Sequence, residues 1–319
     1  MATYLVTGGC GFIGSHLVDQ LVRQGNRVRV LDNLSSGRTH NLAPEAELMI
    51  GDVTDPAIVA LAMKGATGCF HLAANASVDA SADDWLGTHH TNLSGTIAVF
   101  DAARSGAVPV VYASSAAVYG DSGDQRLSET AATRPLSAHG ADKLGCELHA
   151  RVASGQHGVP TAGLRFFNVY GPRQDPASPQ AGVISIFAAR ALADTPMLLH
   201  GDGEQSRDFI FVADGVAHLT AAMDRLLERQ RDRRPTAAAV FNVCTGQPTR
   251  IRDLAMVIAR LSGRPPHIQR TAARNGDIRR SLGDPSAAIR HLRVAATTAL
   301  ENGLRLTLSR LQPEPAHGM

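Results

Sequence analysis

The stretch TGGCGFIG at residues 7–14 decides the fold, because it sets three glycines three residues apart at the end of a short apolar segment. Gly8, Gly11 and Gly14 lie directly before or within the start of a helical-period stretch at 12–24. Glycines at this spacing permit a tight strand-to-helix turn, let the backbone approach a pyrophosphate, and leave helix N-terminal N–H groups facing negative charge. The stretch predicts a dinucleotide-binding turn, although glycines without further support are often only turn formers.

An acidic residue supplies that support. Asp32 lies at the end of the apolar segment 27–33, 18 residues after Gly14. A carboxylate near this spacing accepts hydrogen bonds from the adenosine ribose and repels a 2′-phosphate. The sequence therefore predicts NAD rather than NADP as the cofactor. Polar residues also end two later apolar segments, at Asp52 and at 71–75. The adenine edge would lie near the first and the nicotinamide ribose near the second.

Short apolar segments alternate with helical-period stretches over the first half of the chain. The expected strands are 3–9, 27–33, 68–74, 109–115 and 161–168, and the expected helices are 12–24, 55–64, 84–106 and 139–157. This alternation predicts right-handed βαβ units and a parallel sheet. The expected fold class is α/β, a Rossmann-type doubly wound parallel sheet with a smaller mixed α/β substrate-binding lobe.

The alternation loosens after about residue 170, where a Pro/Gly-rich segment begins and a helix is expected in VISIFAARALAD. We therefore expect an NAD-binding lobe at 1–170 and a second lobe, mainly for substrate, at 171–319. Strands near 208–214 and 239–244 are expected to return to the first sheet.

Composition narrows the class of protein. The chain has 319 residues, 44% of them hydrophobic, and a formal net charge of +2, which suits an enzyme with two lobes. The basic run at 225–234 alternates with acids, as a solvated helix face does, so no nucleic-acid partner is expected. The sequence has no signal-peptide pattern and no apolar run of about 20 residues. We therefore expect no export and no membrane role.

The four cysteines favour a cytoplasmic location. Cys10, Cys69, Cys146 and Cys244 have no CxxC spacing, which fits reduced thiols better than disulfides or a zinc site, and no metal is expected.

Motifs along nearly the whole chain carry a resemblance. They are, in order, TGGCGFIGSHL, VLDNLSSG, HLAA, YASSAAVYG, LRFFNVYGPRQ, GVISIF, GDGEQSRDFIFV, FNVCTG and RNGDIRRSLGD. In these motifs the chain resembles the extended short-chain dehydrogenase/reductase family, in its NAD-dependent nucleotide-sugar epimerase/dehydratase branch, and is most similar to the UDP-glucose (UDP-hexose) 4-epimerases. The resemblance implies a UDP-sugar substrate and an isomerase that works through a transient 4-keto sugar.

The resemblance also implies which residues bind the ligands. Those expected at the cofactor are Gly8, Gly11, Phe12, Ile13, Gly14, Asp32, Asn33, Ser35, Ser36, Gly37, Asp52, Val53, Leu72, Ala73, Ala74, Ala76, Thr91, Lys143 and Phe167. Those expected at the substrate are Ser77, Ser115, Asn168, Val183, Arg207, Arg274, Asp277 and Ser281. The arginines suit phosphate, because a guanidinium stays charged and offers a fork of donors. An ion pair of Arg207 with Asp208 or Glu204 is the alternative for that side chain.

The expected catalytic residues are Ser115, His139 and Lys143. By the resemblance, Ser115 bonds the reacting oxygen, and Lys143 bridges the nicotinamide ribose and lowers the pKa of a tyrosine base. His139 stands where that tyrosine is expected, in LSAHGADK. Imidazole titrates near neutrality without help, but its Nε2 lies about 2 Å closer to its own Cα than a tyrosine oxygen does.

Three interpretations of His139 stay open. In the first, His139 is an atypical base. In the second, Tyr119, His89 or His90 replaces the missing phenol. In the third, the protein is catalytically impaired and binds NAD and a UDP-sugar with little turnover.

The type of reaction and the sugar are less constrained. Ala116 and Ala117 stand where related dehydratases and decarboxylases keep acids, which disfavours those reactions. An NAD-dependent oxidoreductase of another nucleotide-linked substrate remains an alternative. The small side chain of Ser281 leaves room for an N-acetyl group, so UDP-Glc/UDP-Gal and UDP-GlcNAc/UDP-GalNAc are both open.

The resemblance further implies a homodimer. The helical stretches 84–106 and 139–157 match the two helices with which such enzymes form a four-helix bundle between subunits. The alternative is that the apolar residues of these helices pack within the core of a single subunit and not between subunits.

Overall fold

Strand β1 (Thr3–Thr7) lies inside a parallel sheet and is almost wholly buried. The computed structural model describes residues 1–76, 84–178, 180–235, 238–273 and 278–311. Over these residues the sheet has seven strands in the order β10-β6-β5-β4-β1-β2-β3. The remaining strands are β2 (Arg27–Asp32), β3 (Glu47–Ile50), β4 (Gly68–His71), β5 (Val110–Ser115), β6 (Thr161–Phe166) and β10 (Ala238–Val243).

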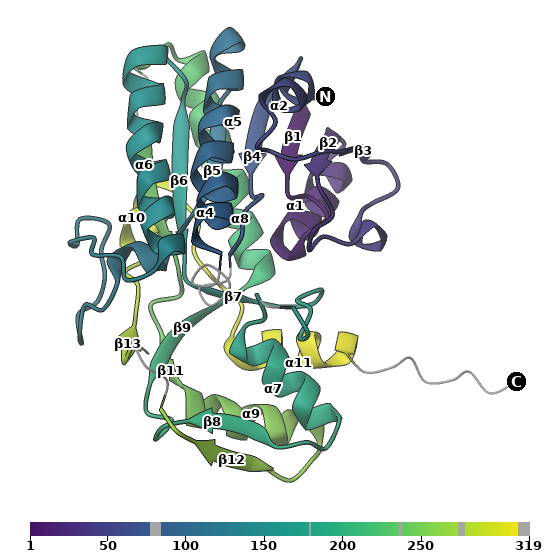
Figure 1. Cartoon of the computed structure of the whole chain (residues 1–319), viewed down its shortest axis with the longest axis vertical. Helices are drawn as coiled ribbons and strands as arrows, with labels where there is room; N and C mark the ends of the chain where they lie inside the picture. Colours follow the sequence, from purple (N-terminus) through teal and green to yellow (C-terminus); the bar gives the residue numbers. More distant parts are fainter. Residues whose placement is uncertain (77–83, 179, 236–237, 274–277, 312–319) are drawn as a thin grey trace, which may run out of the picture.

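Helices cover both faces of this sheet (Figure 1). One face packs on α1 (Phe12–Arg23) and α8 (Val212–Arg231). The other face packs on α2 (Pro56–Met63), α5 (Gly95–Ala103) and α6 (Ala138–His157). Because both faces are covered, β4 and β6 are buried at every residue, and their sequences do not alternate between apolar and polar residues. The arginine and the histidine of these strands have buried partners, since Arg165 pairs with Glu147 and His71 bonds Thr7 and Thr96. The expected α/β doubly wound fold is confirmed.

A continuous helical segment precedes α5. It starts with α4 (Trp85–His89) and passes through a π-helical turn, η2 (His90–Ser94), before α5 begins. Short 3₁₀ turns occur at η1 (Thr39–Asn41), η3 (Arg104–Gly106) and η4 (Ala116–Tyr119).

The second lobe combines short strands with helices. Strand β9 (Ser206–Phe211) pairs with β7 (Asn168–Tyr170), β11 (Pro248–Arg250) and β13 (Arg280–Ser281), and β8 (Met197–His200) pairs with β12 (Ile268–Thr271). The helices of this lobe are α7 (Val183–Leu192), α9 (Ile251–Ser262) and α11 (Leu300–Leu311), and α10 (Ser286–Leu292) packs on α8 and β10.

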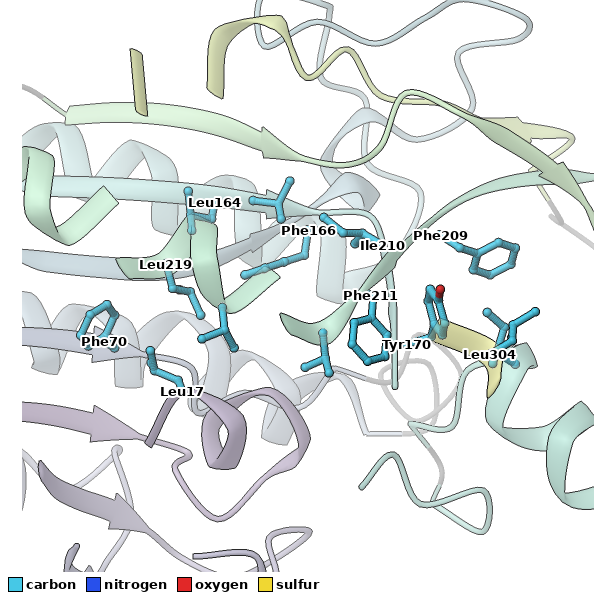
Figure 2. Packing of buried hydrophobic residues seen from close by; sticks show 14 of the residues in the cluster. Leu17, Phe70, Leu164, Phe166, Tyr170, Phe209, Ile210, Phe211, Leu219 and Leu304 are labelled. Carbon is cyan, nitrogen blue, oxygen red and sulfur yellow. The ribbon is translucent and has the colours of Figure 1, made fainter. Parts of the chain in front are cut away.

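One apolar cluster runs through both lobes (Figure 2). It extends from Leu17 of α1 and Phe70 of β4, in the large sheet, through Leu219 of α8 to Phe211 and Leu304 in the second lobe. The two lobes therefore share a core.

The expectation for 208–214 was wrong. The segment 239–244 does return to the large sheet, since β10 pairs in parallel with β6. The strand at 208–214 ends at Phe211, belongs to the second sheet, and is followed at once by helix α8. Either sheet could bury the apolar residues of this strand, so the sequence pattern did not specify its partner strand.

A buried carboxylate joins the lobes. Asp208 on β9 is fully buried. Its Oδ1 accepts hydrogen bonds from the N–H and hydroxyl of Thr245, at 2.8 and 2.7 Å, and its Oδ2 accepts from the N–H groups of Gly246 and Gly283, at 2.8 and 3.3 Å. Thr245 follows β10 of the large sheet and Gly283 follows β13 of the second, so one side chain ties three chain segments together.

We expect Asp208→Ala to lower the free energy of unfolding by about 3 kcal/mol, because it leaves buried N–H donors without an acceptor. Urea unfolding followed by circular dichroism measures the change. The control is Asp202→Ala, which removes an exposed ion pair with Arg279 and is expected to lower the free energy of unfolding far less than Asp208→Ala does. Equal losses in the two variants would contradict the joining role of Asp208.

Candidate active site

The turn between β1 and α1 is built for close backbone contact. Gly8 has φ +71°, and a Cβ there would lie 2.7 Å from the backbone nitrogen of Ala73. A Cβ on Gly14 would overlap the carbonyl oxygen of Gly8. The turn therefore needs glycine at both positions, and it leaves the space at the start of α1 that a pyrophosphate would fill.

Asp32 holds the same turn from β2. Its Oδ2 accepts a hydrogen bond from the Cys10 N–H and its Oδ1 from the Leu34 N–H, both at 2.9 Å. Two carboxylate oxygens have about four acceptor positions, so the ribose hydroxyls can also be accommodated. The glycine turn and Asp32 thus fit the adenosine half of NAD.

A cavity of about 410 Å³ begins at this turn and brings most of the predicted residues together. Eighteen of the predicted cofactor residues line it, namely Gly8, Gly11, Phe12, Ile13, Gly14, Asp32, Asn33, Ser35, Ser36, Gly37, Val53, Leu72, Ala73, Ala74, Ala76, Thr91, Lys143 and Phe167. Asp52 is not in the lining, but its Oδ2 accepts a hydrogen bond from the Asn33 side chain at 2.7 Å.

The three predicted catalytic residues also border this cavity. Ser115 ends β5, and its Oγ accepts a hydrogen bond from the Ala117 N–H at 3.1 Å, which leaves the hydroxyl proton free to donate. Lys143, one turn after His139 on α6, is 3% exposed. Burial lowers the pKa of the Lys143 ammonium group. A buried cation at a cavity wall suits a ligand rich in hydroxyl groups.

His139 has a defined protonation pattern. Its Nδ1 lies 3.1 Å from the carbonyl oxygen of Asn75. A carbonyl oxygen only accepts, so Nδ1 carries the proton and Nε2 holds the lone pair. Burial, followed by the charge of Lys143, lowers the pKa of His139 to about 4, so the ring is neutral at pH 7. His139 therefore presents an acceptor nitrogen at the cavity.

The predicted substitutes for a tyrosine base do not reach the cavity. The Tyr119 hydroxyl donates to Asn242 at 2.7 Å and accepts from Arg165 at 2.9 Å, and burial raises its pKa to about 12. Nδ1 of His89 lies 2.9 Å from Asp142. Among the described residues that line the cavity, neither Tyr119 nor His89 nor His90 occurs.

A second buried histidine, His71, has the opposite tautomer. Thr96 Oγ1 donates to the carbonyl of Asn92, so at 2.9 Å it must accept from Nε2–H of His71. Nδ1 of His71 then accepts from the hydroxyl of Thr7 at 2.8 Å. Both ring nitrogens are used within the core, and burial lowers the pKa of His71 to about 3. His71 is thus a structural residue.

The family profile described as "NAD dependent epimerase/dehydratase family" matches residues 4–233. The chain belongs to this family. The match confirms the predicted family and its dependence on NAD.

Relatives of this epimerase/dehydratase match over almost its whole length. The UDP-glucose 4-epimerase of Mycolicibacterium smegmatis is 36% identical over 312 residues, which are 95% of this chain and 96% of the relative. The solved structure of the Thermotoga maritima UDP-glucose 4-epimerase with UDP-glucose has a TM-score of 0.90 and 32% identity, covering 97% of this chain and 98% of that chain. The Thermus thermophilus UDP-glucose 4-epimerase in complex with NAD has a TM-score of 0.88 and 34% identity, with the same coverage.

The predicted substrate residues of this epimerase/dehydratase are more dispersed. Asn168 lines the cavity beside Ser115, and Val183 begins α7 directly after the lining residue Gly182. Arg207 and Ser281 are outside the lining, but they are register partners on β9 and β13. Ser77, Arg274 and Asp277 lie outside the described residues.

Sequence reasoning missed a group of residues at the mouth of the cavity. Arg38, Arg173, Gln174 and Asp175 line it. Arg38 pairs with Asp175 at 3.6 Å, and Arg173 pairs with Asp19 of α1 at 2.8 Å. These ion pairs hold the segment after β7 against the NAD-binding lobe. For Arg173 and Asp175, the available signal was their charge within a Pro/Gly-rich segment.

Two features are absent from the part of the chain that the structure describes. No cluster of three or more His, Cys, Asp or Glu side chains suited to a metal ion was found in that part of the chain. No helix there is long and apolar enough to cross a membrane.

We expect the stability of this enzyme to fall as the pH drops from about 6.5 to 4, partly through His139. A folded pKa of about 4, below the ordinary 6.5, means that the unfolded chain binds the proton first. Between pH 7.5 and pH 5.0 this single group costs about 2 kcal/mol. Urea unfolding at both pH values measures the change. The free energy of unfolding of His139→Gln should decrease by about 2 kcal/mol less than that of the wild type. The control, His157→Gln at the exposed end of α6, should keep the wild-type loss.

Proposed function

We propose that this chain is an NAD-dependent UDP-hexose 4-epimerase in which His139 replaces the usual tyrosine base. One observation carries the proposal. Ser115, His139 and Lys143 border the same cavity as the dinucleotide turn. In His139 the Asn75 carbonyl is bonded to Nδ1, so Nε2 is the nitrogen that can accept a proton. The relatedness to UDP-glucose 4-epimerases over nearly the full chain supports the substrate class.

The roles follow from the donors and acceptors present. NAD, held by the glycine turn and Asp32, would supply the hydride acceptor for C4 of the sugar and the hydride donor for the opposite face. Ser115 can donate a hydrogen bond from its hydroxyl to the C4 oxygen and keeps its own proton, and the Lys143 ammonium group would hold the nicotinamide ribose. Nε2 of His139 removes the C4 hydroxyl proton and later gives it back. The proton thus stays within the site over one turnover.

The histidine makes the proposed enzyme slow. A base works best when its pKa lies near the operating pH, and a pKa of about 4 is well below it. The shorter side chain also requires the sugar to lie deeper than it would beside a tyrosine, or a water to relay the proton. This weakness favours, as a second candidate, a catalytically impaired protein that binds NAD and a UDP-sugar.

The surroundings constrain the reaction. Ala116 and Ala117 follow Ser115 in η4 and offer no acid for dehydration or decarboxylation. Ser281 is small and lies beside Arg207 on the neighbouring strand, so both a hexose and an N-acetylhexosamine remain candidates. The four buried free thiols support a cytoplasmic location.

We expect the wild type to interconvert UDP-glucose and UDP-galactose slowly, or the corresponding N-acetyl sugars, and His139→Ala to lower kcat by about 100-fold. The reason is that alanine leaves no acceptor for the hydroxyl proton. Chromatography of the nucleotide sugars measures the product. His139→Tyr, which restores a phenol beside Lys143, is the matched variant and should turn over faster than the wild type.

Two outcomes would count against this function. Tight binding of UDP-sugar with no epimer in the wild type would favour the impaired protein. Unchanged turnover in His139→Ala would exclude His139 as the base.

A homodimer through α4, α5 and α6 is also proposed. Helix α6 contacts both α4 and α5, and the three helices lie together over one face of the sheet (Figure 1). They expose large apolar side chains, since Leu148 and Val152 on α6 are 53% and 42% exposed and Trp85 on α4 is 70% exposed. Leu148 and Val152 are one turn apart, so they form a stripe on the helix. A second copy of the same helices would cover this stripe as a four-helix bundle.

We expect the double variant Leu148→Glu/Val152→Glu to elute as a monomer and the wild type as a dimer, because two buried charges would oppose the contact. Size-exclusion chromatography with light scattering gives the mass. Met256→Glu, at an equally exposed apolar position on α9, is the control and should stay dimeric. A monomeric wild type would rule out the proposed interface.

A further inference from the structure

The loop that contacts His139 is itself held by a buried amide. The side chain of Asn92, which is fully buried, bonds both backbone groups of Asn75. Its Oδ1 accepts from the Asn75 N–H at 2.8 Å, and its Nδ2 donates to the Asn75 carbonyl at 3.0 Å. The same carbonyl accepts Nδ1–H of His139 at 3.1 Å. One oxygen therefore links Asn92 to the proposed base.

Asn92 is fixed from its other side as well. It lies in the π-helical turn η2, between α4 and α5. Its own carbonyl accepts hydrogen bonds from the Thr96 hydroxyl and from the Cys146 thiol of α6. Isolated π-helical turns within α-helices recur at functional sites. The amide of Asn92 is thus held in place relative to α6, the helix that carries His139.

A histidine base depends on this kind of support. Neutral imidazole has two tautomers, and only the Nδ1–H form offers a lone pair at Nε2. The Asn75 carbonyl selects that form because it only accepts. In the described part of the chain, no hydrogen bond to Nε2 of His139 is found, so Nε2 remains available at the cavity wall.

We propose that Asn92 is a positioning residue for the reaction. It acts through the backbone carbonyl of Asn75 and keeps His139 in the Nδ1–H tautomer. The inference rests on the proposed function of His139 as the base, but the tautomer can be observed whether or not the protein turns over.

The test is ¹⁵N NMR of the full-length, NAD-loaded protein labelled at its histidines, at pH 7. Long-range ¹H–¹⁵N correlations distinguish Nδ1–H from Nε2–H, and the signal lost in His139→Gln identifies His139. Asn92→Asp is the test variant, because a carboxylate still accepts from the Asn75 N–H but no longer donates to its carbonyl. The matched control is Thr88→Val, which removes only the bond from the Asn75 side chain at 3.2 Å.

We expect Nδ1–H for His139 in the wild type and in Thr88→Val, and loss of that single tautomer in Asn92→Asp. Epimerase kcat should fall at least about tenfold in Asn92→Asp with KM within about twofold, since the tautomer affects the chemical step. If Asn92→Asp does not fold, Asn92→Ser removes the amide without adding a charge and carries the same expectation.

Two results would overturn the inference. One is Nε2–H for His139 in the wild type. The other is an unchanged Nδ1–H tautomer in the folded Asn92 variant. A wild type without turnover but with the expected tautomers would refute the proposed function and leave the role of Asn92 in holding His139 intact.

Discussion

The contact between helix α1 and strand β1 is the constraint on which the rest of the structure depends. The start of α1 approaches the Gly8 carbonyl so closely that Gly14 admits no side chain, and Gly8 in turn packs against the backbone at Ala73. Because β1 lies between β2 and β4, this contact sets the edge at which Asp32 and the loop after β4 meet. A dinucleotide site at the carboxyl edge of a parallel sheet follows from that geometry.

The same contact extends to the proposed base. The loop that packs on Gly8 begins at Leu72 and continues to Asn75, whose carbonyl receives His139. Asn92 closes this loop from the opposite side. The cofactor turn and the orientation of His139 are therefore parts of one backbone arrangement. A change in the glycine turn would shift the Asn75 carbonyl, and a change at that carbonyl would shift the turn.

Local patterns predicted the large sheet because its buried strands read as short, mainly apolar runs between helical stretches, as in 161–168, which contains β6 (Thr161–Phe166). They failed where the outcome depended on distant residues. The strand at Ser206–Phe211 is apolar enough for either sheet, and its partners come from three other parts of the chain. Tyr119 was one possible replacement for the missing phenol in the sequence, but its hydroxyl is bonded to Arg165 and Asn242. No local pattern encodes such contacts.

His71 and His139 show why a histidine cannot be assigned a role from its surroundings in sequence. Both are buried, and burial lowers the pKa of each. His71 donates through Nε2 and accepts through Nδ1 within the core, so neither nitrogen is left for substrate. His139 has a carbonyl at Nδ1, which leaves Nε2 as an acceptor. A tyrosine hydroxyl needs no such selection, because one oxygen both donates and accepts. In the proposed mechanism, the exchange of tyrosine for histidine thus transfers part of the catalytic requirement from the side chain to the backbone of the loop that contacts it.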